Sequence, residues 1–424
     1  MNKKSATVFL SSSAGELEWV LPIVEYLLDN NFDIKIVYRT NTVKKSIESN
    51  AFLKKYIYKH SGIECYKLNW LGQKVNILGV YLYIFKSNLS GVKLLDYCFD
   101  MLDKALGFIF IKCIPKNIVR RVMSGKSLVF LEWPGLKFSS RHRYWIEKSF
   151  SNSIFFYFPH STSTFSSKSW RNYSNSQNEF FQSRSYAMTG YPGDFEAIKI
   201  LGFDVSGVAP AYIGHPRYSR KWLHHFREDF FMLNTDSQSN VVKILVISAN
   251  FSYHLITNEL DTWIASIEKV IQKYFLNYQI MVKLHPREVK SRWDEIIKKS
   301  SSIVLTEESV LEAAHKVNFS ITFLSSSTMD CFLSGTPVIE FINTEQIPIE
   351  NRFGNTKHTD SKEFGIVLSA SNENELENAI NKVTNQNYRI SLDSTHPLFQ
   401  ESIQRSNNWE SHFEKILNAN NIYL

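Results

Sequence analysis

The sequence predicts an α/β protein with two domains, each an open parallel sheet covered by helices. Its length of 424 residues exceeds what one core normally fills, at roughly 150 residues per domain. Short apolar runs of strand type alternate with helix-like periodic stretches in both halves of the chain. Many of these runs end at corners bearing Gly, Pro or polar residues, as expected for strands joined by crossover helices.

The N-terminal half begins with a strand, helix and strand. Apolar residues recur at helical spacing over residues 17–28, between apolar runs of strand length. The strands expected in this half are residues 6–11, 32–38, 127–131 and 153–158. A later stretch, residues 161–184, is rich in Ser, Asn and Gln, which predicts a long loop. Because it follows His160, this loop could close over an acceptor substrate.

The alternation restarts after Asn240 and predicts a second doubly wound domain. Its expected strands are residues 241–248, 279–283, 302–305, 319–323 and 338–341, and its expected helices include 261–275, 293–299 and 309–316. We therefore expect two Rossmann-like domains, the first over 1–210 and the second over 211–395. Residues 396–424 should form a helical segment that could pack back on the first domain. The Gly214-His215-Pro216-Arg217 turn then lies at the junction.

Two polar corners follow strands of the second domain. Leu284-His285-Pro286-Arg287 comes after 279–283, and Ser325-Ser326-Ser327-Thr328 comes after 319–323. In open α/β sheets, ligands bind outside the carboxyl ends of the strands. An imidazole beside Arg287, together with hydroxyls and free N–H groups at a helix start, suits an anion. These residues predict a nucleotide-phosphate site, although a serine run is also a common helix N-cap.

Three further residues follow neighbouring strands and are expected near the donor. Ser248 and Asn250, after 241–248, should approach the donor phosphate. Glu307, after 302–305, should lie near the donor ribose or base, and it is equally consistent with a solvated helix start.

These corners resemble those of the glycosyltransferases of bacterial surface polysaccharides that share a His-Pro motif. That group includes polysialyltransferases and related sialyltransferases, capsule Kdo-type transferases and CDP-glycerol glycerophosphotransferases. The matching stretches are Val282 to Arg287, Leu324 to Ile339 and Ile213 to Tyr218, within residues 205–345. The resemblance implies a GT-B fold, in which two Rossmann-like domains face an interdomain cleft. By this resemblance the N-terminal domain, 1–210, binds the acceptor and the second domain, 211–395, binds the nucleotide sugar. It also implies that His285 contacts the donor phosphate and that Ser325 to Ser327 hold phosphate oxygens.

An inverting transfer needs a general base for the acceptor hydroxyl. We favour Glu132, which precedes Trp133-Pro134-Gly135 and matches the acidic motif of the polysialyltransferases in part. Glu16 follows a corner similar to the one that carries the base in lipid A Kdo transferases, and it could instead face the helix dipole. His160 lies in a corner similar to the histidine corner of the glycerophosphotransferases, and it could be a structural histidine. Because no Asp-x-Asp stands at a strand end, we expect neither a metal nor another cofactor.

Composition and charge restrict where the protein works. The net charge is +7, and the four cysteines form no CxxC pair, which favours a reducing cytoplasm. There is no N-terminal export signal, and the apolar stretch 75–85 is too short to span a bilayer. A basic cluster intermixed with apolar residues suits either an anionic membrane surface or a solvated helix face. Its members are Lys104, Lys112, Lys116, Arg120, Arg121 and Lys126, with Leu106, Phe108, Phe110 and Ile114. Nucleic-acid binding is not expected because no known motif accompanies the charge.

The resulting prediction is an inverting, metal-independent glycosyltransferase of capsule or lipopolysaccharide synthesis. Its donor would be a CMP-activated sugar of the sialic acid or Kdo kind, and its acceptor a glycan or lipid-linked glycan. Three alternatives stay open: a CDP-glycerol or UDP-sugar transferase, a UDP-sugar 2-epimerase, and a non-catalytic glycan-binding subunit. In each case we expect a cytoplasmic protein that could contact the inner face of the membrane peripherally.

Overall fold

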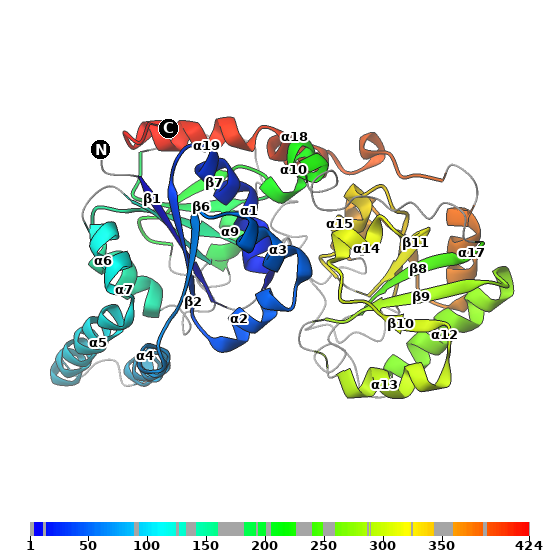
Figure 1. The fold of residues 1–424 in the computed structure, drawn as a ribbon, viewed down its shortest axis with the longest axis horizontal. Helices are drawn as coiled ribbons and strands as arrows, with labels where there is room; N and C mark the ends of the chain where they lie inside the picture. Colours follow the sequence, from blue (N-terminus) through cyan, green and yellow to red (C-terminus); the bar gives the residue numbers. More distant parts are fainter. Residues whose placement is uncertain are drawn as a thin grey trace.

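The computed structural model describes residues 4–11, 14–88, 93–123, 127–132, 141–159, 182–191, 194–200, 205–225, 240–248, 259–285, 288, 290–323, 325–342, 359–384 and 388–423. These residues form two α/β domains that lie side by side, and C-terminal helices run back from the second domain over the first (Figure 1).

The first domain is built on a parallel sheet with seven strands in its described part. The strand order is β3-β2-β1-β4-β5-β6-β7. The strands are β1 (Ser5–Leu10), β2 (Asp33–Tyr38), β3 (Ile63–Lys67), β4 (Leu128–Glu132), β5 (Ile154–Phe158), β6 (Ser185–Thr189) and β7 (Ala209–Tyr212). The sheet therefore extends past residue 210, and Pro210 stands in its edge strand, where a missing N–H is tolerated.

Helices cover both faces of this sheet. One face is covered by α1 (Ala14–Asp29), whose apolar residues join those of β1, β2 and β4 in a single buried cluster. The other face carries a second cluster that includes residues of α4, α5, α6 and α7. Besides α1, the described helices around this sheet include α2 (Asn41–Glu48), α3 (Ala51–Lys59), α4 (Trp70–Asn88), α5 (Lys93–Cys113), α6 (Lys116–Met123), α7 (Arg141–Ser149) and α9 (Asp194–Ile200). No described helix is both long and apolar enough to cross a membrane.

The second domain repeats the same design. Its described strands form a six-stranded parallel sheet in the order β10-β9-β8-β11-β12-β13. These strands are β8 (Val242–Ile247), β9 (Tyr278–Lys283), β10 (Ile303–Leu305), β11 (Phe319–Thr322), β12 (Val338–Phe341) and β13 (Leu368–Ala370). Around them lie α12 (Glu259–Tyr274), α13 (Lys290–Lys299), α14 (Val310–Ala314), α15 (Thr328–Leu333), α16 (Asp360–Phe364) and α17 (Glu373–Thr384).

In both sheets the chain starts in the middle, adds strands on one side and then returns to the other. The strand order consequently reverses between β1 and β4 in the first sheet and between β8 and β11 in the second. In doubly wound sheets, ligands bind at the carboxyl ends of the strands that flank such a reversal. The topology thus identifies one edge of each sheet as the place for a site.

The C-terminal helices join the two domains. After η5 (Leu392–Ser394), helices α18 (Pro397–Asn407) and α19 (Trp409–Ala419) extend over the first domain, so the two chain termini lie close together (Figure 1). The Phe413 ring lies tilted against those of Phe130 and Phe156 of the first sheet, with centroids 6.4 Å and 5.2 Å away, and it belongs to the buried cluster of that domain. Lys221 of α10 (Arg220–His225) pairs with Glu410 of α19 at 2.6 Å.

Candidate functional site

Three of the predicted donor-site residues stand at the ends of three adjacent strands. Ser248 follows β8, His285 follows β9 after one intervening residue, and Ser325 follows the end of β11. Because β8 lies between β9 and β11, their carboxyl ends are neighbours. Ser248 and Ser325 flank the reversal of strand order in the second sheet, where a ligand is expected.

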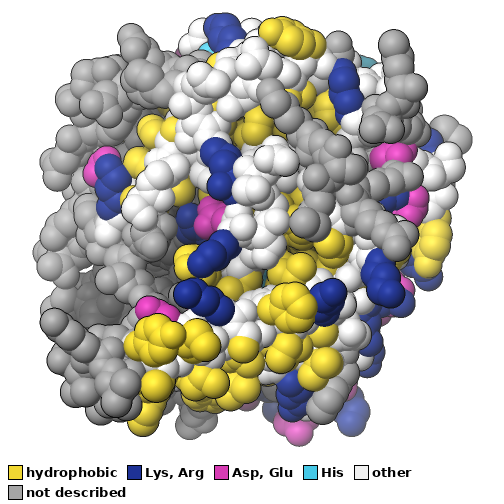
Figure 2. Space-filling model, turned by 90° about the vertical axis from the view of Figure 1, so that its left-hand side faces the viewer, with side chains coloured by type: hydrophobic (Ala, Val, Ile, Leu, Met, Phe, Trp, Pro, Cys, Tyr) yellow, Lys and Arg dark blue, Asp and Glu magenta, His cyan; other side chains and the backbone are white. Residues whose placement is uncertain are grey.

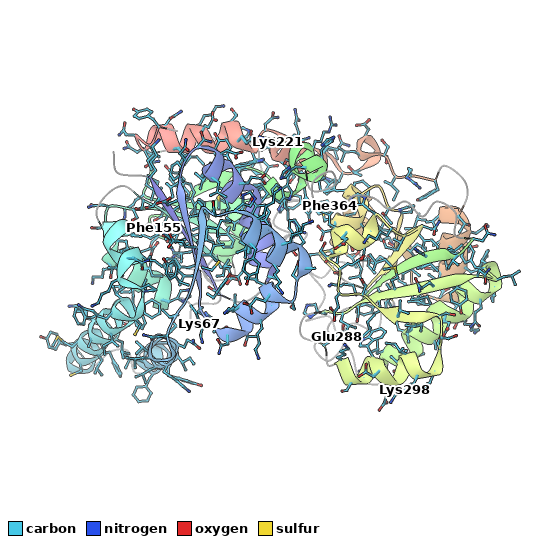
Figure 3. The ribbon with its side chains drawn as sticks, viewed as in Figure 1. Lys67, Phe155, Lys221, Glu288, Lys298 and Phe364 are labelled. Atoms are coloured by element: carbon cyan, nitrogen blue, oxygen red, sulfur yellow. The ribbon has the colours of Figure 1, made fainter. Side chains whose placement is uncertain are left out.

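The corner after β9 is held by Glu288, a residue that the sequence reading did not select. Its carboxylate accepts hydrogen bonds from the backbone N–H of His285 at 2.9 Å and from Ser248 Oγ at 2.6 Å. Trp293 Nε1 donates a third bond at 3.3 Å. One carboxylate therefore ties β8, the His285 corner and α13 together. Glu288 lies on the side of the second domain that faces the first (Figure 3).

Burial and hydrogen bonding act in opposite directions on Glu288. Loss of solvent raises the pKa of its carboxyl, and the bonds from Ser248, His285 and Trp293 oppose that rise. His285 as a whole residue is partly exposed. The corner thus combines a fixed backbone with a residue that solvent reaches in part.

The serine turn presents three partly exposed residues, Ser325, Ser326 and Ser327. The Ser325 hydroxyl accepts from the Ser327 N–H at 3.2 Å, and no hydrogen bond from the Ser327 side chain caps α15. Thr328 is different, because it is fully buried and its hydroxyl bonds to Thr322 Oγ1 at 3.2 Å. Helix α15 has only six residues, so a ligand here would rely on hydroxyls and turn N–H groups more than on a helix dipole.

Lys283 brings positive charge to the same edge. It is the last residue of β9, and its Nζ donates to the backbone carbonyl of Glu307 at 3.2 Å. Burial lowers the pKa of the Lys283 ammonium, and the carboxylates of Glu18 and Glu307 oppose that change. Glu18 belongs to α1 of the first domain, so a carboxylate of the first domain acts on the pKa of Lys283 in the second domain. Glu307 itself is exposed.

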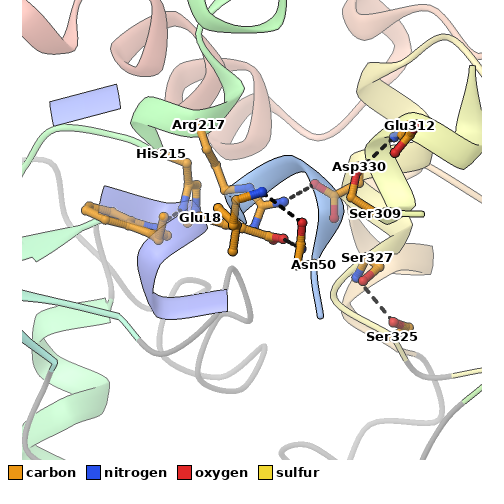
Figure 4. A network of polar contacts seen from close by, with 11 residues as sticks. Glu18, Asn50, His215, Arg217, Ser309, Glu312, Ser325, Ser327 and Asp330 are labelled. Carbon is orange, nitrogen blue, oxygen red and sulfur yellow. Dashed lines mark hydrogen bonds and ion pairs between the residues drawn. The ribbon is translucent and has the colours of Figure 1, made fainter. Parts of the chain in front are cut away.

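Arg217 links the two domains directly (Figure 4). Its guanidinium donates to Asp330 of α15 at 2.6 Å and lies 3.4 Å from Glu18 of α1. Asn50, at the start of α3, donates to the other oxygen of Glu18 at 2.9 Å. Glu18 and Asp330 lie in helices that follow the carboxyl ends of β1 and β11. Their shared partner therefore sets those edges of the two sheets toward each other.

The Arg217 pair is buried, with 12% of the Arg217 side chain and 7% of the Asp330 side chain exposed. Burial raises the pKa of Asp330 to about 6, and the Arg217 guanidinium opposes that rise. Burial alone would lower the pKa of Arg217, but the neighbouring groups, with Asp330 the strongest of them, outweigh burial and raise it, so the guanidinium stays charged. A charged pair that loses one partner in such a place is strongly destabilised.

His215, two residues before Arg217, is the buried residue of this turn. It is 2% exposed, accepts a hydrogen bond at Nδ1 from Trp19 Nε1 at 3.3 Å, and donates its backbone N–H to Ser406 Oγ at 2.7 Å. Burial, assisted by Arg217, lowers the pKa of the imidazole to about 3, so the ring is neutral. A Cβ atom on Gly190 would lie 1.9 Å from His215 Nε2, so only glycine fits there. His215 is thus a packing residue at the domain interface.

The candidate bases of the first domain occupy different surroundings. Glu132 ends β4, opposite Phe158 of β5 and beside the reversal of strand order, and it is partly exposed. Glu16 is fully buried in the first turn of α1, where its carboxylate accepts the Ser11 N–H at 2.5 Å. Glu16 therefore closes the turn after β1. His160, Pro286, Arg287 and Asn250 lie outside the described residues, as does most of the long loop after His160.

Sequence reasoning missed Glu288 and the Glu18 partner of Arg217. The spacing of His285 and Glu288 could have revealed this contact. In a capping box, an acid three residues after the first residue of a turn accepts a hydrogen bond from the backbone N–H of that first residue. No group of three His, Cys, Asp or Glu side chains in the described part of the chain could hold a metal ion. All four cysteines are free.

Comparisons with known proteins agree with this architecture. The sequence matches no protein-family model, and no curated protein matches it either. Solved structures do match in fold. S. aureus MnaA bound to UDP gives a TM-score of 0.54 at 11% identity, covering 99% of this chain and 98% of the other. The UDP-GlcNAc 2-epimerase of Methanocaldococcus jannaschii, in complex with UDP-GlcNAc and UDP, gives 0.53 at 12%, covering 96% and 99%. A glycosyltransferase from Rickettsia africae gives 0.50 at 12%, covering 99% of each chain.

At these identities the likeness concerns the fold. None of the three is named as a polysialyltransferase or capsule transferase, so they support the broader architecture and not the narrower group that the His-Pro and serine corners resemble. The fold observed here, with two parallel sheets of doubly wound strand order, agrees with the match to these structures over nearly the whole length of the chain. The chain therefore has the GT-B fold, with two Rossmann-like domains.

Proposed function

We propose that the protein is an inverting glycosyltransferase that uses a nucleotide-sugar donor and needs no metal. The observation that carries this proposal is the convergence of Ser248, His285 and Ser325 at the ends of β8, β9 and β11. The donor phosphate would lie against these ends, on the side that Arg217 sets toward the first domain.

The chemistry of the site suits departure of a nucleotide. When the bond to the anomeric carbon breaks, negative charge develops on the leaving phosphate and must be met by groups already in place. The serine turn supplies hydroxyl and N–H donors, His285 supplies an imidazole and Lys283 a cation at the same edge. Glu288 fixes the backbone of the His285 corner, so these donors need little rearrangement.

Glu132 is the proposed general base. It stands at the carboxyl end of β4 beside the strand reversal of the first sheet, and it is partly exposed. A base must reach the acceptor hydroxyl, which favours an accessible carboxylate over Glu16, whose carboxylate is buried against the Ser11 N–H. His160 is the second choice for this role.

The proposed donor is a CMP-activated sugar of the sialic acid or Kdo kind, and the acceptor a glycan or lipid-linked glycan at the inner face of the cytoplasmic membrane. A donor with one phosphate needs only a compact cradle of His and Ser. A second candidate function is UDP-sugar 2-epimerisation, favoured by the fold shared with UDP-GlcNAc 2-epimerases. An epimerase isomerises its donor without an acceptor, so the two functions are separable.

Thermal stabilisation by CMP, CDP and UDP is the first test. We expect the largest shift with CMP. A shift selective for UDP would redirect the donor assignment, and no shift with any nucleotide would favour a non-catalytic glycan-binding subunit. His285→Ala should abolish the shift, whereas His224→Ala, an exposed histidine on α10, should retain it.

Reaction assays then separate transfer from epimerisation. CMP-sialic acid, UDP-GlcNAc and CDP-glycerol, each alone and with capsule or lipopolysaccharide fragments, are followed by NMR. Acceptor-dependent release of CMP supports transfer, whereas isomerisation of UDP-GlcNAc alone would establish the epimerase instead. Glu132→Gln should keep nucleotide binding and lose transfer. Chelators should leave the rate unchanged, and loss of activity restored by magnesium would contradict the metal-free mechanism.

A further inference from the structure

Helices α4 and α5 carry an unusual amount of exposed apolar surface. Of the fifteen large hydrophobic side chains that are exposed in the described part of the chain, ten lie on these two helices. They are Leu71, Ile77, Leu78, Tyr81, Phe85, Tyr97, Met101, Leu102, Phe108 and Ile109. Single exposed apolar residues are ordinary, but a contiguous group indicates an interaction site.

These side chains form one stripe along each helix. On α4, Leu71, Leu78 and Phe85 are spaced by seven residues, with Ile77 and Tyr81 beside them, so all lie on one face. On α5, Tyr97, Met101 and Phe108 follow helical spacing in the same way. The two helices pack against each other, and Phe85 contacts Phe99 with 5.7 Å between ring centroids.

The opposite face of each helix is fixed on the domain core. A Cβ atom on Gly79 would lie 2.4 Å from the Trp145 indole, and one on Gly107 would lie 2.7 Å from it. Both glycines therefore let the helices rest directly on Trp145 of α7. Val75 and Phe110 belong to the buried cluster on the same side. Because this inner face is already packed, neither helix can rotate to hide its outer stripe.

Positive charge accompanies the stripe. Lys74, Lys104, Lys112 and Lys116 are exposed on α4, α5 and the start of α6, and Asp100 is the exposed acid among the described side chains of these helices. The Lys112 ammonium lies 5.1 Å from the centre of the Phe108 ring. Figure 2 shows hydrophobic side chains gathered over the lower part of this face, with Lys and Arg side chains among and beside them.

We propose that the α4–α5 face docks on the surface of a bilayer that contains anionic lipids. The two helices would lie flat, with the apolar stripe at the boundary of headgroups and acyl chains. The lysines would reach the lipid phosphates while their methylene stems stay along the apolar surface. This inference is independent of the proposed transferase reaction, because it depends only on this face.

The residues involved differ from those suggested by the sequence. Lys104, Lys112, Lys116 and Phe108 are exposed as a membrane contact requires. Phe110 and Ile114 were wrongly grouped with them, since they are 2% and 1% exposed and pack in the core. Leu106 is partly buried. The side chains of Arg120 and Arg121, and Lys126 as a whole, lie outside the described part.

The test is co-sedimentation of the full chain with large unilamellar vesicles. Vesicles of phosphatidylcholine alone are compared with vesicles that also contain phosphatidylglycerol. One variant combines Leu78→Gln with Phe108→Ser, and another combines Lys104→Gln with Lys112→Gln. The matched controls are Leu276→Gln, a fully exposed apolar residue of the second domain, and Lys298→Gln with Lys299→Gln on α13. Circular dichroism and light scattering establish that each variant is folded and report its oligomeric state.

We expect the wild type to bind phosphatidylglycerol vesicles in a salt-sensitive way and phosphatidylcholine vesicles much less. The apolar variant should bind at least about tenfold more weakly, and each lost lysine should weaken binding about fivefold. The controls should bind like the wild type. Absence of wild-type binding, or equal binding by the apolar variant, would overturn the proposal. So would a dimer in solution that the apolar variant splits, because the face would then be covered by a second copy.

Discussion

Replacing Glu288 by glutamine tests whether one carboxylate organises the donor edge. The carboxylate accepts from His285 N–H, Ser248 Oγ and Trp293 Nε1. Glutamine keeps the size of the side chain but has only one acceptor oxygen, and its NH2 group cannot accept. The Ser248 hydroxyl can turn and accept from that NH2 group, but either the His285 N–H or the Trp293 N–H loses the acceptor it has in Glu288.

The cost follows from the type of bond that is lost. A hydrogen bond to a charged group contributes about 1.5–3 kcal/mol, and a buried donor left unpaired costs about 1–3 kcal/mol. Burial also raises the pKa of Glu288, so the ionised carboxyl already carries a penalty that glutamine removes. We therefore expect a net loss of about 1–2 kcal/mol in the free energy of unfolding at neutral pH.

Urea unfolding of the Glu288→Gln variant measures this loss, with Glu295→Gln as the control. Glu295 lies on the exposed side of the adjacent helix α13, so its replacement should change stability by less than about 0.5 kcal/mol. The nucleotide that stabilises the wild type should bind Glu288→Gln more weakly. If the two variants unfold at the same urea concentration and bind nucleotide equally, Glu288 does not hold the corner.

Three further predictions concern the domain interface and the helices of the first domain. The unfolded chain protonates His215 below pH 6.5, but the folded chain only near pH 3, so stability is full above pH 6.5 and is lost as pH falls. Protonation of His215 should lower the free energy of unfolding by about 2 kcal/mol between pH 6.5 and pH 5. Urea unfolding at these two pH values should show this loss in the wild type and not in His215→Gln. Arg217→Ala should cost about 3 kcal/mol near neutral pH, because the buried Asp330 loses its counter-ion and must stay charged without it or take up a proton. The loss measured by thermal unfolding should shrink at pH 5, where Asp330, with a pKa of about 6, is protonated in the wild type as well. Equal losses at both pH values would contradict the buried-charge explanation. Gly79→Ala should lower stability by about 1–3 kcal/mol because its Cβ would overlap Trp145, and an unchanged melting temperature would show that the helix can move away.

Several inner strands of each sheet could be predicted because they are short runs rich in apolar residues, and β1 and β12 are buried along their whole length. The expected runs at 6–11, 279–283 and 338–341 correspond to β1, β9 and β12 within a residue or two. Three of the four edge strands of the described sheets gave a weaker signal, whereas the edge strand β10 matches the expected 302–305. β3 has mostly exposed residues and includes the polar Glu64 and Lys67, β7 contains Pro210, and β13 has only three residues. None of these three resembles an apolar run.

The position of the donor corners could be predicted for the same reason. Ser248, His285 and Ser325 each follow a central strand, so finding the strand locates the residue. Which way a side chain points depends on packing and could not be predicted. Thr328 stands in the same polar run as Ser325, yet it points inward to Thr322. Similarly, Phe108 and Phe110 are two residues apart, yet Phe108 is exposed and Phe110 is buried.

The role of Arg217 depends on contacts between domains. Its partners Glu18 and Asp330 are far away in the sequence, on either side of it, and no local pattern connects them. The turn at 214–217 could be placed at the junction, but its ion pairs follow only from the packed arrangement of the two sheets.

Hydrogen exchange with and without nucleotide tests the donor site most directly. In the presence of the nucleotide that stabilises the protein best, we expect slower exchange in the segments ending β8, β9 and β11, around Ser248, His285 and Ser325 to Ser327. Segments of α13 and α17 that lie away from this edge should be unchanged. Protection confined to other segments, or no protection with any nucleotide that binds, would contradict a donor site at the carboxyl edge of the second sheet.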